Sequence, residues 1–159
     1  FSKNVAKITD AAHSFKTGKH RLELVMEFNK IKFINDSKAT NPDATTAALD
    51  FYGHKKNILL ILGGLDKNMD FSALITRSEK IKKAYITGQC KEKIFFLLKN
   101  QVDCALLSKF ENAVNAACDE ARQGDTVLMS PACASMDEFK NYEERGQKFV
   151  EIIKRRFLK

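Results

Sequence analysis

The chain contains little proline, moderate glycine and no long apolar run. Two prolines and seven glycines among 159 residues, with 44% hydrophobic residues, argue against a disordered or fibrous protein. The longest apolar run covers only residues 58–62, whereas a membrane span needs about 20 residues. No apolar signal segment follows Phe1. We therefore expect neither a membrane anchor nor a membrane partner.

Cysteines and histidines lack the spacing of a metal site. The four cysteines form no C-x-x-C pair, and the three histidines are far apart in the sequence. We expect no metal ligands in this chain, and cysteine use of this kind predicts the disulfide-free cytoplasm. Cys118 falls on an apolar helical face and is expected in the core.

Positive charge exceeds negative charge, with 27 Lys and Arg against 20 Asp and Glu and a net charge of +7. The lysines are scattered, and no run reaches five basic residues. The densest group, residues 154–156, is expected at the end of an amphipathic helix, where cations suit the helix dipole. This pattern favours a solvated lysine-rich surface over binding to nucleic acid or an anionic membrane.

The apolar pattern alternates between the periods of strands and helices. Such alternation implies βαβ crossovers and one α/β domain, with a mostly parallel sheet and helices on both faces. The first two strands meet at Asn29-Lys30, which predicts an N-terminal β-hairpin. The expected strands cover residues 22–28, 31–35, 57–62, 83–87, 102–106 and 126–130.

Helical spacing predicts a helix after each later strand and one after the hairpin. Asn41 can cap the first helix, with Pro42 in its first turn and Gly53 past its end. Further helices are expected near residues 71–75, 90–98 and 110–121. The apolar face of the first helix is predicted to be Ala44, Ala47, Ala48, Phe51 and Tyr52.

The last helix is expected to start at Ser135, because Ser135 and Glu138 have capping-box spacing. It should run to about Phe157. Its predicted buried residues are Phe149, Ile152 and Ile153.

Ligands of open parallel sheets bind beyond the carboxyl ends of the strands. Three segments there are rich in small or polar residues: 35–41, 63–67 and 130–135. A helix starting at Ser135 would offer free N–H groups to a carboxylate or phosphate, although a tight strand-to-helix turn explains that segment equally well. In 63–67, a flexible turn with a surface lysine is the favoured interpretation when that segment is taken alone. The sequence has no G-x-x-x-x-G-K-[ST] and no G-x-G-x-x-G loop.

The segment 35–41 combines charges and amides between a strand and a helix. Asp36 could accept from a ribose hydroxyl or help hold a cation, and Lys38 could meet an anion. The alternative is helix-entry capping with a local Asp–Lys ion pair. The basic pair His20-Arg21 before the first strand is, on its own, an ordinary exposed dipeptide.

Together these segments resemble the C-terminal domain of the Mur ligase family, and within it the members that add D-glutamate. The resemblance runs from about residue 18 to the C-terminus in the family's order. It implies a Rossmann-like domain at 19–159, preceded at 1–18 by the end of a connection from a central domain. The matching segments are 20–23, 35–42, 63–67, 70–71, 130–135, 137 and 139–146.

The resemblance implies an ATP-dependent ligase of peptidoglycan synthesis in the bacterial cytoplasm. ATP would phosphorylate the carboxylate of UDP-N-acetylmuramoyl-L-alanine, and the amine of D-glutamate would attack the resulting acyl phosphate. The P-loop and most Mg²⁺ ligands of this family lie in other domains, so this chain alone is expected to be inactive, and we expect a monomer. Two alternatives remain: a stand-alone binding or regulatory module of the same fold, and a sibling ligase that adds another amino acid.

The resemblance also assigns roles to individual residues. Lys38 would lie near the acyl phosphate as the catalytic cation, and Arg145 would have a structural or closure-linked role. ATP would be reached by His20, Arg21 and Asp36. D-glutamate would be held by Thr40, Lys67, Ser135, Met136 and Tyr142.

Overall fold

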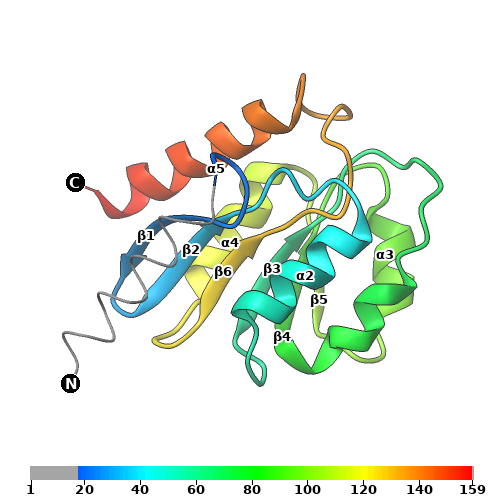
Figure 1. Ribbon diagram of the computed structural model, residues 1–159, viewed down its shortest axis with the longest axis horizontal. Helices are drawn as coiled ribbons and strands as arrows, with labels where there is room; N and C mark the ends of the chain where they lie inside the picture. Colours follow the sequence, from blue (N-terminus) through cyan, green and yellow to red (C-terminus); the bar gives the residue numbers. More distant parts are fainter. Residues whose placement is uncertain (1–17, 159) are drawn as a thin grey trace.

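The computed structural model describes residues 18–158, so nearly all of the connection expected at 1–18 lies outside the described residues. Six strands form one sheet in the order β1-β2-β6-β3-β4-β5 (Figure 1). Only the pair β1–β2 is antiparallel, which confirms a mostly parallel sheet with an N-terminal hairpin. The strands are β1 (Glu23–Phe28), β2 (Ile31–Asn35), β3 (Ile58–Leu62), β4 (Ile81–Ile86), β5 (Cys104–Leu106) and β6 (Thr126–Met129).

Helices cover both faces of the sheet, as predicted (Figure 1). One apolar cluster joins the sheet to α2, η1 and α3 on one face. A second cluster joins it to α4 and α5 on the other. The helices are α2 (Pro42–Tyr52), the 3₁₀ helix η1 (Ser72–Lys80), α3 (Lys91–Leu98), α4 (Phe110–Glu120) and α5 (Tyr142–Phe157).

The apolar run of β3 lies at the centre of the sheet. All five of its residues are buried between β6 and β4, with helices above and below. A strand covered on both faces has no polar side, which explains why the run shows no alternation.

The predicted apolar face of α2 is only partly correct. Asn41 caps the helix through its side chain, and Gly53 follows its end, as expected. However, Ala47 and Phe51 are exposed, and Ala44 is half-buried. Several alanines at helical spacing look like a buried face in the sequence, although alanine is also common on exposed helix surfaces. The predicted buried face of α2 therefore differs from the observed one. The buried residues are Pro42, Thr45, Ala48, Leu49 and Tyr52.

The prediction that a helix starts at Ser135 is wrong. The amides of Glu138 and Phe139 both bond to the carbonyl of Ser135, which makes a single turn that does not continue. The Glu138 carboxylate does not return to Ser135. It accepts from the Phe110 amide at 3.2 Å and thereby caps α4.

Helix α5 instead begins seven residues later, at Tyr142. The Asn141 side chain accepts from the Glu144 amide at 2.8 Å, and the Glu144 carboxylate accepts from the Lys140 amide. The first bond is the N-cap bond of the helix, and the second ties the residue before the cap to the first turn. The helix still buries Phe149, Ile152 and Ile153, as predicted.

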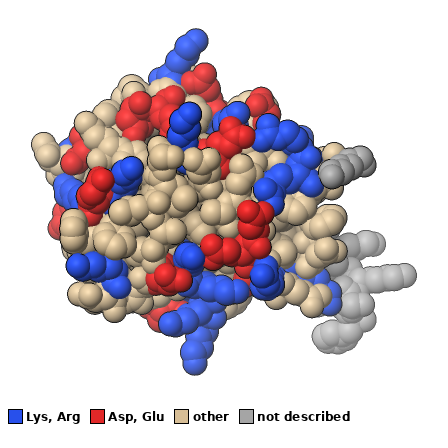
Figure 2. Space-filling model, turned by 180° about the vertical axis from the view of Figure 1, so that it is seen from behind, with Lys and Arg blue, Asp and Glu red and all other residues tan. Residues whose placement is uncertain are grey.

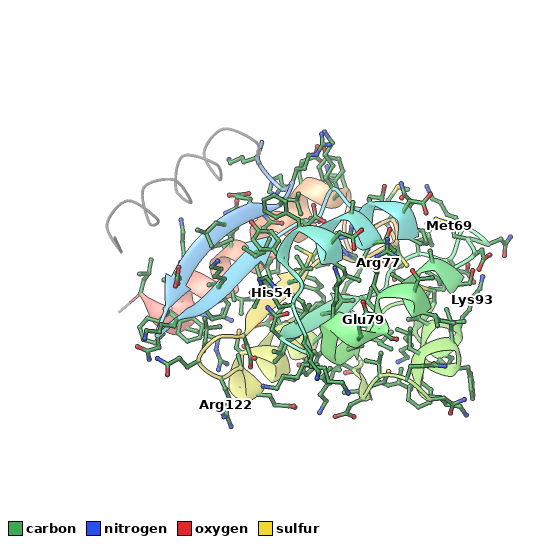
Figure 3. The ribbon with its side chains drawn as sticks, turned by 60° about the horizontal axis from the view of Figure 1, so that its bottom comes forward. His54, Met69, Arg77, Glu79, Lys93 and Arg122 are labelled. Atoms are coloured by element: carbon green, nitrogen blue, oxygen red, sulfur yellow. The ribbon has the colours of Figure 1, made fainter. Side chains whose placement is uncertain are left out.

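A surface ion pair joins the two neighbouring helices α2 and η1. Arg77 of η1 is labelled in Figure 3. It contacts Asp50 of α2 through two parallel bonds, of 2.6 Å from Nε and 3.0 Å from the terminal nitrogen. The two-bond geometry fixes the orientation of η1 on this face more strictly than a single contact would.

Charges of both signs alternate over the surface shown in Figure 2, with no broad field of one sign. Between residues 18 and 158, no helix combines the length and the apolar character needed to cross a membrane.

Candidate functional site

Three loops meet beyond the carboxyl ends of β2, β3 and β6. The loop after β3 pairs with the loop after β6 through a bridge between Leu65 and Ala134, with the Leu65 amide 2.8 Å from the Ala134 carbonyl. The Gly63 amide also bonds to the Pro131 carbonyl. Gly64 has a φ of 157°, and a Cβ there would collide with the Ala134 carbonyl, so the paired glycines permit this close approach.

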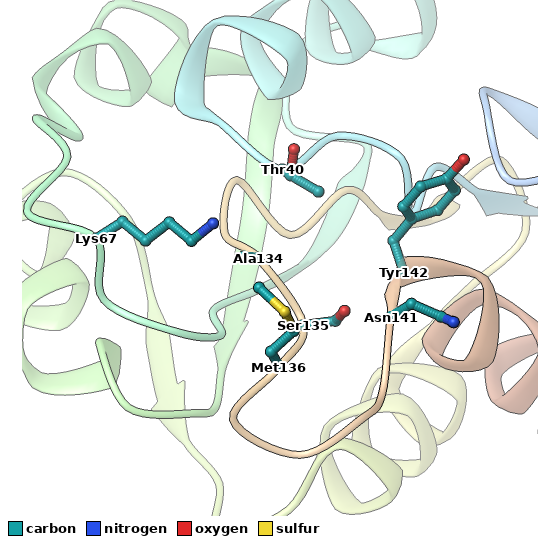
Figure 4. Close-up of a pocket in the computed structure, with 7 residues that line it drawn as sticks. All are labelled: Thr40, Lys67, Ala134, Ser135, Met136, Asn141 and Tyr142. Atoms are coloured by element: carbon teal, nitrogen blue, oxygen red, sulfur yellow. The ribbon is translucent and has the colours of Figure 1, made fainter.

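These loops and the start of α5 enclose a first cavity of about 220 Å³. Figure 4 shows Lys67 entering from the loop after β3 and Tyr142 standing on the opposite side, with Ser135 and Met136 between them. Every residue that the sequence associated with an amino-acid ligand therefore lines one cavity. The lining residues are Thr40, Lys67, Ala134, Ser135, Met136, Asn141 and Tyr142.

The electrostatics of the first cavity differ from the expectation. No helix starts at Ser135, so the helix N-terminus at this cavity is that of α5, at Asn141 and Tyr142. The positive charge in the cavity comes from the exposed ammonium of Lys67, and hydroxyls come from Thr40, Ser135 and Tyr142. One mobile cation among several hydroxyl groups is suited to a small anionic ligand.

Asn141 and Ala134 line the first cavity but were missing from the predicted site. Asn141 is the residue that caps α5, so its place at the cavity follows from where that helix begins. The sequence does contain a signal for it, because Asn141 and Glu144 have capping-box spacing. The competing spacing at Ser135 hid that signal.

A second cavity of about 260 Å³ lies on the other side of the loop after β2. Arg21, Asp36 and Lys38 line it, together with the alanines of α2. Lys38 and Thr40 are two residues apart, yet they face different cavities. The loop after β2 therefore separates the two cavities and contributes to both.

Asp36 is almost completely buried beside the second cavity. It accepts from the Leu22 amide at 3.0 Å and from the Ser130 hydroxyl at 2.7 Å. An ion pair between Asp36 and Lys38 was one of the alternatives from the sequence. The observed hydrogen-bond partners of the Asp36 carboxylate are instead these two neutral donors. Burial raises the pKa of Asp36 to about 6, against the opposing effect of the two hydrogen bonds and of Arg21.

His20 is buried and lines neither cavity. Its Nδ1 accepts from the Asn35 side-chain amide at 2.9 Å, since the Asn35 oxygen is already occupied by the Ser37 amide. A neutral ring then carries its proton on Nε2. The ring packs edge-to-face on Tyr142 and against Gly146, where a Cβ would collide with Nδ1.

Arg145 is a buried guanidinium that joins two of the loops. It donates to the Ser37 hydroxyl at 2.9 Å, to the Ser37 carbonyl at 2.8 Å and to the Cys133 carbonyl at 2.9 Å. Ser37 in turn donates to the Tyr142 carbonyl at 2.7 Å. Burial lowers the pKa of Arg145 to about 10, so the group stays charged at neutral pH. Arg145 thus fixes the loops after β2 and β6 relative to the start of α5.

A family model described as "Mur ligase, glutamate ligase domain" matches residues 20–133. The UDP-N-acetylmuramoylalanine--D-glutamate ligase of Acidobacterium capsulatum is 42% identical over 147 residues, which cover 92% of this chain and 32% of that protein. The enzyme of the same name from Francisella philomiragia is 40% identical over 154 residues, covering 96% of this chain and 37% of that protein. The chain thus spans about a third of the length of these relatives.

Solved structures share the fold at low sequence identity. The UDP-N-acetylmuramate-alanine ligase MurC from Thermotoga maritima has a TM-score of 0.61 at 14% identity, covering 96% of this chain and 34% of that one. FolC from Escherichia coli, solved with DHPP and ADP, has a TM-score of 0.64 at 19% identity, covering 90% and 33%. Both likenesses support the Rossmann-like architecture.

Proposed function

Since the chain belongs to the Mur ligase family, as its glutamate ligase domain, we propose that it supplies the D-glutamate site of a UDP-N-acetylmuramoylalanine–D-glutamate ligase. The single observation that carries this proposal is the first cavity. Polar side chains from four separate segments converge there: Thr40, Lys67, Ser135 and Tyr142. Relatives about 40% identical over nearly the whole chain carry the name of that ligase, which favours D-glutamate over the substrate of a sibling ligase.

Lys67 would neutralise one carboxylate of D-glutamate, and the hydroxyls of Thr40 and Ser135 would bind the other. The ring of Tyr142 and the side chain of Met136 would form the apolar walls, which limit the ligand to a short side chain. Such contacts leave the amine free to act as the nucleophile. Holding two reactants in attacking geometry is a large part of what a ligase of this kind must do.

The second cavity would receive part of the ATP. Asp36 would accept from a ribose hydroxyl, and Arg21 would meet the phosphates. Lys38, which lines the second cavity, would neutralise charge on the acyl phosphate of UDP-N-acetylmuramoyl-L-alanine as the amine attacks. His20 is enclosed, so its reach toward the nucleotide would be through Nε2.

Metal binding would fall to other parts of the ligase. Within residues 18–158, no three His, Cys, Asp or Glu side chains are grouped in a way that could hold a metal ion. Mg²⁺ and the P-loop would therefore come from the two thirds of the relatives' length that this chain does not span. We accordingly propose that the chain alone does not turn over, and that the whole enzyme acts in the bacterial cytoplasm.

Replacement of Lys67 tests the proposal. In a ligase that contains this sequence, Lys67→Met should raise the KM for D-glutamate by roughly 10- to 100-fold, as expected for the loss of a contact between charged groups. The KM for ATP should change little, because Lys67 lies in the first cavity. Steady-state kinetics with each substrate varied in turn gives both values.

Lys55→Met is the matched control, since Lys55 is exposed in the turn between α2 and β3, at the opposite end of the sheet. It should leave both KM values unchanged. In the 159-residue chain, isothermal titration should also show binding of D-glutamate that Lys67→Met weakens. An unchanged KM for D-glutamate in the Lys67 variant would refute the proposed site.

A further inference from the structure

Two buried cysteines meet close to the first cavity, since Cys133 directly precedes Ala134, which lines it. The Sγ atoms of Cys90 and Cys133 lie 3.0 Å apart, and their residues are 1% and 0% exposed. They are 43 residues apart in the sequence, at the start of α3 and in the loop after β6. Both thiols are free, as are those of Cys104 and Cys118.

The backbone around this pair is closely packed. The Cys90 amide donates to the Gly64 carbonyl at 3.1 Å, and a Cβ on Gly64 would stand 2.9 Å from the Cβ of Cys133. The Cys133 carbonyl is held by Arg145 at 2.9 Å. The two sulfur atoms are therefore held together by the loops after β3, β4 and β6, and not by a flexible segment.

The two thiols also have different acidities. Cys90 precedes the first turn of α3, where the helix dipole favours a thiolate. Hydrogen bonds from Cys133 and from the Gly64 backbone lower the pKa of Cys90, against the effects of burial and of Asp66 and Asp137. The interaction with Cys90 and burial raise the pKa of Cys133, with Arg145 opposing. The position at the start of α3 therefore makes Cys90 the better nucleophile of the two thiols.

We propose that Cys90 and Cys133 are an oxidation site that a peroxide converts to a reversible disulfide. The Cys90 thiolate attacks a peroxide oxygen, the O–O bond breaks, and the departing oxygen leaves as water after taking a proton. The sulfur atom of Cys133 then attacks the Cys90 sulfenic acid, an S–S bond replaces the S–O bond, and a second water leaves with the Cys133 proton. Hydrogen peroxide is reduced to two waters as the two thiols are oxidised.

The second step needs the two sulfur atoms to approach by only about 1 Å, because they already lie 3.0 Å apart. A disulfide at this place would join the start of α3 covalently to the loop that carries Ala134 and Ser135. The oxidation site is therefore next to the first cavity, but it does not depend on what ligand that cavity binds.

Mass spectrometry of the 159-residue chain after peroxide treatment tests the proposal. The folded protein should lose the mass of two hydrogen atoms, and dithiothreitol should restore it. Trypsin separates the four cysteines into four peptides. The peptide of residues 84–91 should appear cross-linked to that of residues 123–140, while the peptides holding Cys104 and Cys118 keep free thiols.

Two variants complete the experiment. Cys104→Ala should still form the cross-link at the wild-type rate. Cys133→Ala should abolish it and leave a sulfenic acid on Cys90 that a cyclic dione traps. The proposal is overturned if Cys104, the most exposed of the four, oxidises while Cys90 and Cys133 remain thiols. Oxidation of either residue to sulfinic acid without the cross-linked peptide would overturn it as well.

Discussion

The burial of the Asp36 carboxylate lowers the free energy of unfolding at neutral pH. Its carboxylate lies 4% exposed at the wall of the second cavity, and its two hydrogen-bond donors are neutral groups. Burial opposes ionisation more strongly than these donors favour it, which is why the pKa of Asp36 rises from 3.8 to about 6. A carboxylate kept under such conditions is typical of a functional position.

We predict that Asp36→Asn stabilises the chain at neutral pH and not in acid. Because the pKa is higher in the folded state, the Asp36 contribution favours folding at low pH and is lost as the pH rises from about 4 through about 6. The pKa difference corresponds to at most about 3 kcal/mol. Urea unfolding at pH 4 and pH 7 gives the free energy of unfolding of the variant relative to wild type. This difference should increase in favour of the variant by about 2 kcal/mol from pH 4 to pH 7.

Thr46→Ala is the control for this measurement, because Thr46 also lies in α2 and has no titratable side chain. Its effect on the free energy of unfolding should stay nearly constant over the same pH range. A difference between Asp36→Asn and wild type that is equal at both pH values would contradict the assigned cause.

Individual site residues were predictable only in part. Lys67 and Asp36 stand out in the sequence because a charge follows a strand end among small residues. Nothing local shows that Lys38 and Thr40 face different cavities, since that depends on how the loop after β2 packs. The burial of His20 was equally hidden, because it arises from Gly146, more than a hundred residues away.

At the scale of elements, the hairpin turn between β1 and β2 is tighter than its residues prefer. Asn29 and Lys30 have φ values of 51° and 59°, which is the left-handed pair of a two-residue hairpin turn. Asparagine tolerates this conformation, whereas lysine does so less readily. The turn is therefore correct in length but not optimal in sequence.

Lys30→Gly should stabilise the chain by about 0.5–1 kcal/mol, because glycine adopts a positive φ without steric cost. Chemical denaturation measures the difference. Lys32→Gly, two residues later within β2, removes the same side chain from a strand interior and should destabilise by a similar amount. If both variants changed stability in the same direction, the turn argument would fail.

Sequence patterns located the elements well and their ends less well. Every predicted strand and helix has a counterpart, because most elements show a helical or strand period in the sequence and β3 shows a continuous apolar run. The start of the last helix was wrong because Ser135 and Asn141 both precede an acidic residue by three positions. Only the packing of Glu138 onto α4 decides between the two caps, and that contact is long-range.

For the whole molecule, the net charge of +7 is distributed and not concentrated. Lysines and arginines alternate with acidic residues over the face in Figure 2. Ion pairs between opposite charges occur elsewhere in the described residues too, such as Lys83–Glu120 and Arg155–Glu111. A surface of mixed charge does not form the continuous positive path that would bind the phosphate backbone of a nucleic acid.

We predict that the chain binds a 20-bp DNA duplex with a Kd weaker than about 1 μM at physiological salt. Fluorescence anisotropy of the labelled duplex checks this directly. Repeating the titration at low salt should strengthen the binding, as for any basic surface. Nanomolar affinity at physiological salt would instead show that the positive charge forms a specific nucleic-acid surface.

The position of β6 makes the two parts of the sheet depend on one segment. Residues 126–129 are the last of the described strands in the sequence, yet they lie between β2 and β3. No other strand joins β1-β2 to β3-β4-β5 within the described residues, so a chain cut before residue 126 would lack the strand that unites them. Such a truncation would also remove Ser135, so the continuity of the sheet and the first cavity would be lost together.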